Sequence, residues 1–385
     1  MIHTNISLIL TLSLLIWGSP FVAKLVRIPV PPVEIILGSL FAAAGFITEN
    51  IYFELIAEVG FLYLMFLAGM EVDLKQLSRS SKSVIHKALL FLTLLILFSI
   101  TSGLLFGLNI VTIISMPLIS IGLLASLSKS YGKEQSWIQL AFIVGILGEM
   151  MSIASLTIFD AAITTGFNFS LIEKITYLML FLGSVYFIYK LIHLLFWWFP
   201  ELKRVLVPKF DTADQDIRLA MALFFIMIAL MLFLELELAL GAFIAGVAIS
   251  TFFHHEKRLE EKMSSLGFGF LVPLFFIHIG ASLDIHSILE EGVLLGALLI
   301  TTLMLASRLL AAIVLKKIQG SKDALLVALS LSMPLTLMIA VATIGYETNM
   351  LVLLEYYQLI LASIFEILIA MILIKVLSRE KIERD

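Results

Sequence analysis

The sequence predicts an all-α, multi-pass membrane protein with about thirteen transmembrane helices arranged as two inverted repeats. Three observations support this fold class. Hydrophobic residues make up 61% of the 385-residue chain and charged residues only 14%, whereas about a quarter of the residues in soluble domains are charged. Apolar runs recur along the whole chain, separated by short polar connections. One proline motif and one glutamate also recur at the same spacing in the two halves.

Each apolar run is about 17–25 residues long, which is enough to cross the hydrocarbon core of a bilayer. The predicted spans cover residues 6–23, 33–47, 54–72, 86–107, 109–128, 137–160, 174–198, 218–235, 238–253, 266–283, 289–315, 323–346 and 354–377. The longest polar connection, about 199–217, joins the two halves. We therefore expect one transmembrane domain over 1–385, with repeat one at about 6–160, a connector at about 174–217, repeat two at about 218–377 and no soluble regulatory domain.

Lysine and arginine residues predict the orientation, because loops rich in them stay in the cytoplasm. The loops after the odd-numbered spans hold 22 of the 25 basic residues, and the opposite side holds only Lys174. We therefore expect the N-terminus outside and the C-terminus in the cytoplasm. A compact chain of this kind suits the inner (plasma) membrane of a bacterium. The net charge of −4 gives no indication of a nucleic-acid partner, and the absence of cysteine excludes disulfides and thiolate metal sites.

A repeated motif indicates that the two halves are related. Pro117 and Pro334 both lie within Ser-Met-Pro-Leu, 217 residues apart, and the same spacing carries Glu149 onto Glu366. A proline inside a membrane helix removes a hydrogen bond, and a carboxylate there costs from about 3 to well over 10 kcal/mol. Broken helices beside an ionisable group at the middle of the bilayer are typical of two-repeat secondary transporters.

The order of the spans gives the orientation of the repeat. The fifth and sixth spans pair with the twelfth and thirteenth, and the third and tenth spans both end in Gly-x-x-x-Asp, at Gly69–Asp73 and Gly280–Asp284. A shift of seven spans is odd, so the two copies must cross the membrane in opposite directions. The alternative is chance, because short apolar matches arise easily in membrane sequences.

Glu149 is the strongest candidate for a functional residue, since it lies near the centre of the sixth span between Gly145, Gly148 and Ser152. Burial favours its neutral form, whereas a cation entering the site favours the charged form. A proton and a cation would therefore compete for this carboxylate, while the flanking glycines would let another backbone approach closely. The alternative is a permanently protonated or ion-paired glutamate that holds helices together.

Pro117 and Pro334 are the predicted helix breaks, which would leave backbone oxygens and opposed helix ends near the site. The nearby hydroxyls that can add oxygen ligands for a hard cation belong to Ser115, Ser120, Ser332 and Thr336. The alternative for each proline is a simple kink.

Other charged residues have supporting or uncertain roles. Arg308 lies within the eleventh span, where it can pair with Glu149 or Glu366 or extend toward the cytoplasmic end of its helix. Glu366 is either a second titrating site, the partner of Arg308, or a neutral packing residue. His278 can titrate near neutral pH or serve as a hydrogen-bonded packing residue. Four further glutamates are expected near span ends, within reach of solvent, and are assigned no role beyond charge at an entrance to the site: Glu34, Glu58, Glu235 and Glu237.

Four segments resemble the monovalent cation:proton antiporter-2 family in the same order along the chain. Residues 31–33 (PPV) resemble the start of its second helix, and residues 58–73 (EVGFLYLMFLAGMEVD) resemble its third-helix signature. Residues 240–246 (LGAFIAG) and 273–284 (PLFFIHIGASLD) resemble two later signatures. The resemblance covers essentially the whole chain.

This resemblance implies a dimerisation domain, a core with crossed, broken fifth and twelfth helices, and exchange of Na⁺ or K⁺ for H⁺ at an acidic residue of the sixth helix. Many members carry Asp-Asp, Asn-Asp or Gln-Asp at that point, whereas this chain has Gly148-Glu149. The family's basic residue of the eleventh helix falls on Arg308. With one carboxylate and one fixed positive charge, we expect electroneutral exchange.

The partners implied are a monovalent cation, a proton, the lipid bilayer and a second copy of the chain in a homodimer. No cofactor and no resident metal are expected beyond the transported cation at Glu149, and gating by a nucleotide on this polypeptide is not expected. Two alternatives remain open: a K⁺ efflux system that needs a separate regulatory subunit, and a non-transporting relative with a sensing or structural role. A membrane enzyme is not expected, because no nucleophile–base pair or metal cluster is evident in the sequence.

Overall fold

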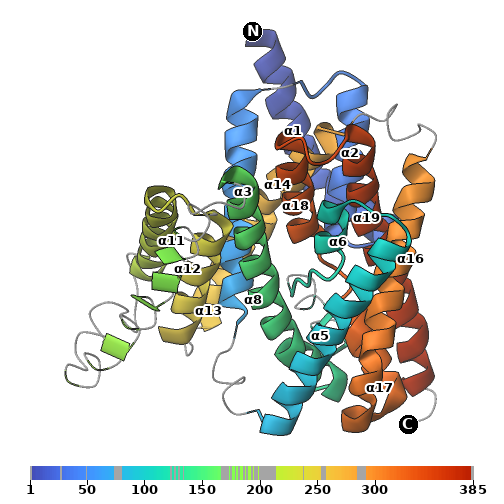
Figure 1. Ribbon diagram of the computed structural model, residues 1–385. Helices are drawn as coiled ribbons and strands as arrows, with labels where there is room; N and C mark the ends of the chain where they lie inside the picture. Colours follow the sequence, from blue (N-terminus) through green and yellow to red (C-terminus); the bar gives the residue numbers. More distant parts are fainter. Residues whose placement is uncertain are drawn as a thin grey trace. The chain divides into compact units, whose positions relative to one another are not determined.

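Figure 1 shows a computed structural model that describes residues 2–26, 28–48, 50–72, 80–121, 134–165, 214–236, 238–252, 257–283 and 292–382, with scattered positions at 124–132 and 173–198. All regular elements in these ranges are helices, so the all-α class is confirmed. In chain order the helices are α1 (Ile2–Val26), α2 (Val30–Ala43), α3 (Ile51–Met70), α5 (Lys82–Leu105), α6 (Ile110–Ser115), α8 (Ser136–Thr165), α11 (Gln215–Phe233), α12 (Leu238–Phe252), α13 (Lys257–Leu266), η1 (Gly267–Leu271), α14 (Val272–Ala281), α16 (Val293–Ala311), η2 (Ala312–Val314), α17 (Lys316–Ser330), α18 (Leu335–Glu347) and α19 (Leu353–Ile382).

The helices have the lengths that a membrane protein requires. Among the described residues, eight helical stretches are long and apolar enough to cross a bilayer, and α17 with α18 makes a ninth if the two count as one broken span. The helices α2 and α12 are apolar but shorter. Twelve of the thirteen predicted spans contain at least part of a described helix, whereas the seventh, 174–198, lies largely outside the described residues.

Large apolar side chains on the outer helix faces are exposed. Trp17 and Leu25 of α1 are 70% and 83% exposed, and Phe233 of α11 is 83% exposed. An apolar exterior of this extent is a liability in water but is the expected surface toward lipid tails.

Short polar or proline-containing sequences set several helix starts. The side chain of Ser81 accepts a hydrogen bond from the Val84 N–H at the start of α5. Asn109 does the same for the Val111 N–H at the start of α6. Such caps satisfy backbone donors that have no partner inside the helix. At α2, Pro31 and Pro32 lie in the first turn, where proline's missing N–H costs nothing.

The chain divides into two compact units. The first comprises Met1–Gly60, Lys75–Ser152 and Phe270–Asp385, and the second comprises Phe61–Leu74 and Ile153–Gly269. In the first unit, α2 packs closely on α14, while α16 packs on α19 and α5, and α18 packs on α19 and α6.

Glycines allow close helix packing in both units. In the first, a Cβ atom at Gly280 would collide with the Ile35 carbonyl, and one at Gly38 would collide with the Ile277 carbonyl. In the second, a Cβ atom at Gly69 would collide with the Phe243 carbonyl. Gly69 and Gly280 begin the two Gly-x-x-x-Asp motifs, but Asp73 and Asp284 lie outside the described residues.

Candidate functional site

The first helix break follows α6. This helix ends at Ser115, two residues before Pro117, and residues 118–121 have no regular helical structure. Met116, the residue before the proline, still has helical backbone angles, but Pro117 has no N–H to donate and so cannot continue the helical hydrogen bonds. Within this unwound segment, Met116–Ile121, the Met116 and Leu118 N–H groups still bond to carbonyls of α6, whereas the Ile119 and Ile121 N–H groups bond to side chains of another helix.

The second break lies between α17 and α18. The first of these ends at Ser330, the second begins at Leu335 immediately after Pro334, and the two are bent by 45°. The break after α6 leaves the unwound residues mostly after the proline, whereas here they come before it. The two identical Ser-Met-Pro-Leu motifs are therefore opened at different points.

The described helix of the first broken span, α6, runs beside α18 and in the opposite direction within the first unit. The short helix α6 packs on α18, as Figure 1 shows, and the Asn109 side chain donates to the Met350 carbonyl beyond the end of α18 (2.9 Å). Near the start of α17, Gln319 donates to the Ser136 carbonyl at the start of α8 (2.8 Å). The two helices that contain the predicted breaks thus lie together, with α6 packed on α18.

Glu149 of α8 faces the first break and is fully buried. Its Oε2 accepts a hydrogen bond from the Ile121 N–H (2.7 Å), and the Ser120 hydroxyl lies 3.5 Å from its Oε1. The first distance is that of a strong charge-assisted hydrogen bond, and the second is long for a hydroxyl donor. The carboxylate therefore binds the backbone of the segment that Pro117 opens.

Gly145 and Gly148 make room for this segment on α8. A Cβ atom at Gly148 would lie 2.7 Å from Ile119 Cδ1 and 3.1 Å from Ile119 Cβ. A Cβ atom at Gly145 would lie 2.5 Å from Ile121 Cγ2. A backbone was expected to approach these two glycines, but the atoms nearest to them belong to side chains, chiefly those of Ile119 and Ile121.

Arg308 and Glu366 form a fully buried ion pair in the first unit. Arg308 Nη1 donates to Glu366 Oε1 (2.6 Å), and Nη2 donates to the Leu118 carbonyl in the unwound segment (2.6 Å). Within the described residues, Arg308 Nε and Glu366 Oε2 are buried without a hydrogen-bond partner. Arg308 thus joins the second glutamate to the first helix break.

The other predicted oxygen ligands lie in different surroundings. Ser115 donates to the Thr112 carbonyl and Ser332 to the Ala328 carbonyl, each within its own helix or at its end. Thr336 lies in the first turn of α18 and is 8% exposed. Of the four predicted hydroxyls, Ser120 is the one for which the structure gives a contact with Glu149.

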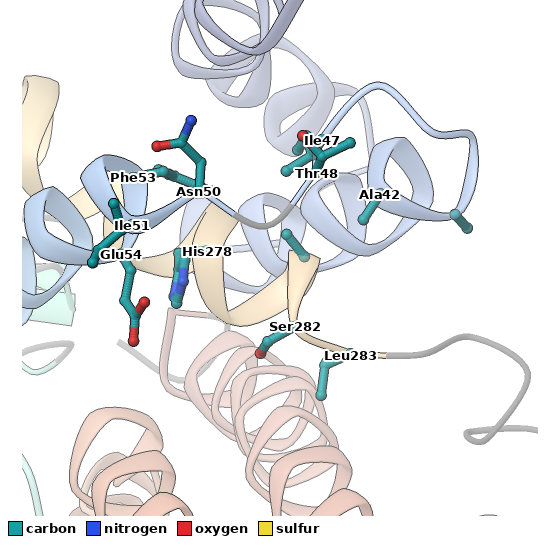
Figure 2. Close-up of a pocket in the computed structure, with 12 residues that line it drawn as sticks. Ala42, Ile47, Thr48, Asn50, Ile51, Phe53, Glu54, His278, Ser282 and Leu283 are labelled. Carbon is teal, nitrogen blue, oxygen red and sulfur yellow. The ribbon is translucent and has the colours of Figure 1, made fainter. Parts of the chain in front are cut away.

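His278 lies in a different part of the first unit. It lines a cavity of about 700 Å³ that lies between the ends of α2 and α14 and the start of α3. Glu54 and Asn50 line the same cavity (Figure 2). The Phe53 ring packs edge-on against its imidazole, with centroids 5.0 Å apart. The residues that line this cavity do not include Glu149 or the unwound segment.

Two features were not foreseen from the sequence. Glu34 was expected within reach of solvent, but it is only 3% exposed, and the buried Ser19 donates to its Oε1 (3.1 Å). That expectation was wrong because α1 covers this face of α2. Ser152 was not considered as a site residue, yet its hydroxyl accepts a hydrogen bond from the Ile119 N–H (2.8 Å). Its position one turn after Glu149 was the available signal.

Comparison with known proteins gives one family over most of the chain. The family model described as "Sodium/hydrogen exchanger, transmembrane" matches residues 9–379. The putative Na(+)/H(+) antiporter YjbQ of Bacillus subtilis is 24% identical over 91% of this chain, and this chain spans only 59% of its length. The Na(+)/H(+) antiporter of Enterococcus hirae is 25% identical over 90% of both chains.

The fold has a counterpart among solved structures. The sodium proton antiporter MjNhaP1 of Methanocaldococcus jannaschii superposes with a TM-score of 0.63, at 15% identity, over 96% of this chain and 94% of that one. At this identity the similarity concerns the fold alone, and it agrees with the predicted antiporter-like arrangement of crossed, broken helices.

Proposed function

The chain belongs to the sodium/hydrogen exchanger family, and we propose that it exchanges a monovalent cation, Na⁺ or K⁺, for a proton at Glu149. The proposal is supported by the family, by the antiporter fold and by a buried carboxylate at a helix break.

The observation that carries the proposal is the unequal pairing of the two repeat-related glutamates. Glu366 has a positive partner in Arg308, 2.6 Å away, whereas the described residues give Glu149 only the Ile121 N–H and the Ser120 hydroxyl. A carboxylate buried without a cationic partner is unstable when charged. Glu149 is therefore the group that gains most from taking up either a proton or a cation.

Competition at one carboxylate accounts for exchange. A proton neutralises Glu149 by a covalent O–H bond, and a cation neutralises it electrostatically, so the two cannot be bound there together. Oxygen ligands suit Na⁺ and K⁺, and Glu149 and Ser120 can supply two of them, with backbone carbonyls of the unwound segment as further candidates. If only the occupied, neutralised site can move between the two faces of the membrane, each step carries one ion of charge +1. One turnover then moves no net charge, and the exchange is electroneutral.

The family resemblance also supports roles for four further residues of the site. Arg308 and Glu366 supply supporting charge, and Pro117 and Pro334 supply the breaks. The protein is proposed to act as a homodimer in the inner (plasma) membrane of a bacterium, with its N-terminus outside and its C-terminus in the cytoplasm.

Proton movement in proteoliposomes tests the proposal. The purified protein is reconstituted with a pH-sensitive dye, and Na⁺, K⁺ or Li⁺ is added in turn to the parent, Glu149→Gln and Glu366→Gln proteins. We expect cation-driven proton movement in the parent, none in Glu149→Gln, and retained exchange in Glu366→Gln. The parent rate with Na⁺ or Li⁺ should be the same with and without valinomycin at equal K⁺ concentrations on both sides, because electroneutral exchange builds no membrane potential for the ionophore to collapse.

Three other outcomes contradict parts of the proposal. Loss with Glu366→Gln alone, in a protein that remains folded, would move the site to the second repeat. K⁺ flux that does not depend on a proton gradient would favour the efflux system. A folded parent that responds to no cation would favour a non-transporting relative.

A further inference from the structure

The unwound segment is held by side chains from two helices of the first unit. On α8, Glu149 accepts the Ile121 N–H and Ser152 accepts the Ile119 N–H. On α16, Arg308 donates to the Leu118 carbonyl. Glu149 and Arg308 belong to the proposed exchange site, but Ser152 has no role in it so far.

The geometry of Ser152 suits a fixed anchor. Its hydroxyl donates to the Gly148 carbonyl of its own helix (2.8 Å), which fixes the direction of the O–H bond and leaves an oxygen lone pair for the Ile119 N–H. Side chains three residues apart on a helix lie on one face, and the two N–H groups that they accept, those of Ile119 and Ile121, are two residues apart in the unwound segment. The Glu149 carboxylate and the Ser152 hydroxyl therefore accept the Ile121 and Ile119 N–H groups, respectively, as two neighbouring hydrogen bonds between α8 and the unwound segment.

The second repeat does not have this arrangement. The spacing of 217 residues carries Ser152 onto Ile369, Gly148 onto Phe365 and Ile121 onto Met338. The Met338 N–H donates to the Pro334 carbonyl (2.8 Å) at the start of α18, as part of a helix. At the related positions, which the structure describes, the second repeat therefore has no hydroxyl anchor.

We propose that Ser152 is a positioning residue that keeps the unwound segment in register with α8 while Glu149 changes between its proton-bound and cation-bound forms. A protonated carboxyl is a weaker acceptor than a carboxylate, so the Ile121 N–H is held less strongly when Glu149 carries a proton. The Ser152 hydroxyl does not titrate, and its hydrogen bond to Ile119 is the same in both forms. This inference rests on the proposed exchange at Glu149.

The test compares three variants with the parent in the proteoliposome assay. Ser152→Ala removes the anchor, and Ser152→Thr keeps a hydroxyl at the same position. Thr157→Val is the matched control, because Thr157 is buried on the same helix and its hydroxyl donates only to the Ile153 carbonyl of that helix (2.9 Å).

We expect Ser152→Ala to raise the KM for the cation by about three- to tenfold, as for loss of one buried hydrogen bond, with a smaller change in maximal rate. The pH of half-maximal exchange should move upward, because the charged form of Glu149 receives less support from the Ile121 N–H. Ser152→Thr should restore much of both values, and Thr157→Val should leave them near those of the parent. A merely structural serine would lower the amount of folded protein without moving KM or the pH profile.

Hydrogen exchange of the peptide containing Met116–Ile121, measured by mass spectrometry, tests the anchor without relying on transport. Faster exchange of this peptide in Ser152→Ala than in Thr157→Val supports the inference, and equal exchange in the two overturns it. If the parent transports and Ser152→Ala shows parent KM and pH dependence, the inference fails while the proposed function stands. If the parent does not transport, the proposed function fails, and the amide exchange still decides whether Ser152 holds the segment.

Discussion

At the scale of single residues, Glu149 and Glu366 differ in their partners: Glu366 pairs with the positive charge of Arg308, whereas Glu149 contacts uncharged groups of the first helix break. Sequence reasoning identified both glutamates, both prolines and Arg308, because an ionisable side chain or a proline is conspicuous in an apolar helix. It left open which glutamate Arg308 contacts, since positions along the sequence do not show which residue of another helix a long side chain can reach. It also could not identify the Ile121 N–H, because every residue except proline carries such a group.

Removing Arg308 should destabilise the protein more than removing the whole ion pair. Arg308→Leu leaves Glu366 buried without its partner, for which about 3–5 kcal/mol is typical. The double variant Arg308→Leu/Glu366→Leu should recover part of this loss but not all of it, because the Leu118 carbonyl still lacks its donor. Thermal unfolding in detergent measures the stability of the single and of the double variant. A double variant no more stable than Arg308→Leu would contradict the expected pairing energy.

Gly148→Ala should disturb the site directly. The new methyl group would lie 3.1 Å from Ile119 Cβ, which cannot move without the backbone of the unwound segment. Overpacking of this kind costs about 1–3 kcal/mol, and we expect a lower melting temperature and a slower cation-driven proton flux. Gly18→Ala in α1 is the control, since no atom lies within 4 Å of a Cβ atom there. Equal behaviour of the two variants would show that the close approach at Gly148 is unimportant.

At the scale of elements, the sequence predicted that the two Ser-Met-Pro-Leu motifs open their helices, but not where. Unwinding follows Pro117 in one case and precedes Pro334 in the other. The difference arises from the neighbouring helix: α8 offers Glu149 and Ser152 as acceptors for freed N–H groups, whereas α19 has Ile369 in place of the serine. A four-residue motif carries no information about such partners.

The packing of α2 on α14 should be the element contact most sensitive to small substitutions. Gly280→Ala would place a methyl group against the Ile35 carbonyl, and neither backbone can rotate away as a side chain can. Small residues at such contacts are what allow helices in membranes to approach closely. We expect Gly280→Ala to reduce the yield of monodisperse protein in size-exclusion chromatography, with Gly18→Ala again unaffected. A well-folded Gly280→Ala protein would show that the two helices separate at little cost.

At the scale of the whole molecule, composition and apolar periodicity were enough to predict an all-α membrane protein. Every span must be apolar, long enough to cross the bilayer and able to satisfy its own backbone hydrogen bonds, because lipid tails offer no partners. The motifs at 58–73 and 273–284 placed it in an antiporter family, and the match over residues 9–379 agrees with that. The predicted connector, 174–217, lies largely outside the described residues.

The predicted orientation can be tested with single cysteines, since the chain contains none. We expect a membrane-impermeant maleimide to label Val352→Cys only from outside and Lys317→Cys only from the cytoplasmic side. Both positions are exposed, Val352 just before α19 and Lys317 in the first turn of α17. Labelling in right-side-out and inverted vesicles distinguishes the two faces. The opposite pattern would reverse the orientation inferred from the basic loops.

The hydrogen bond from the Ile121 N–H to Glu149 has a consequence for how this site tolerates genetic change. Its donor belongs to the main chain, so any residue but proline at position 121 supplies it, whereas the acceptor depends on one codon. In a library of all single substitutions selected for growth under salt stress, position 121 should accept several apolar residues and reject proline, while position 149 should accept almost nothing. The donor of this hydrogen bond is thus preserved by the backbone conformation and not by the identity of a residue, so a comparison of residue identities does not detect it.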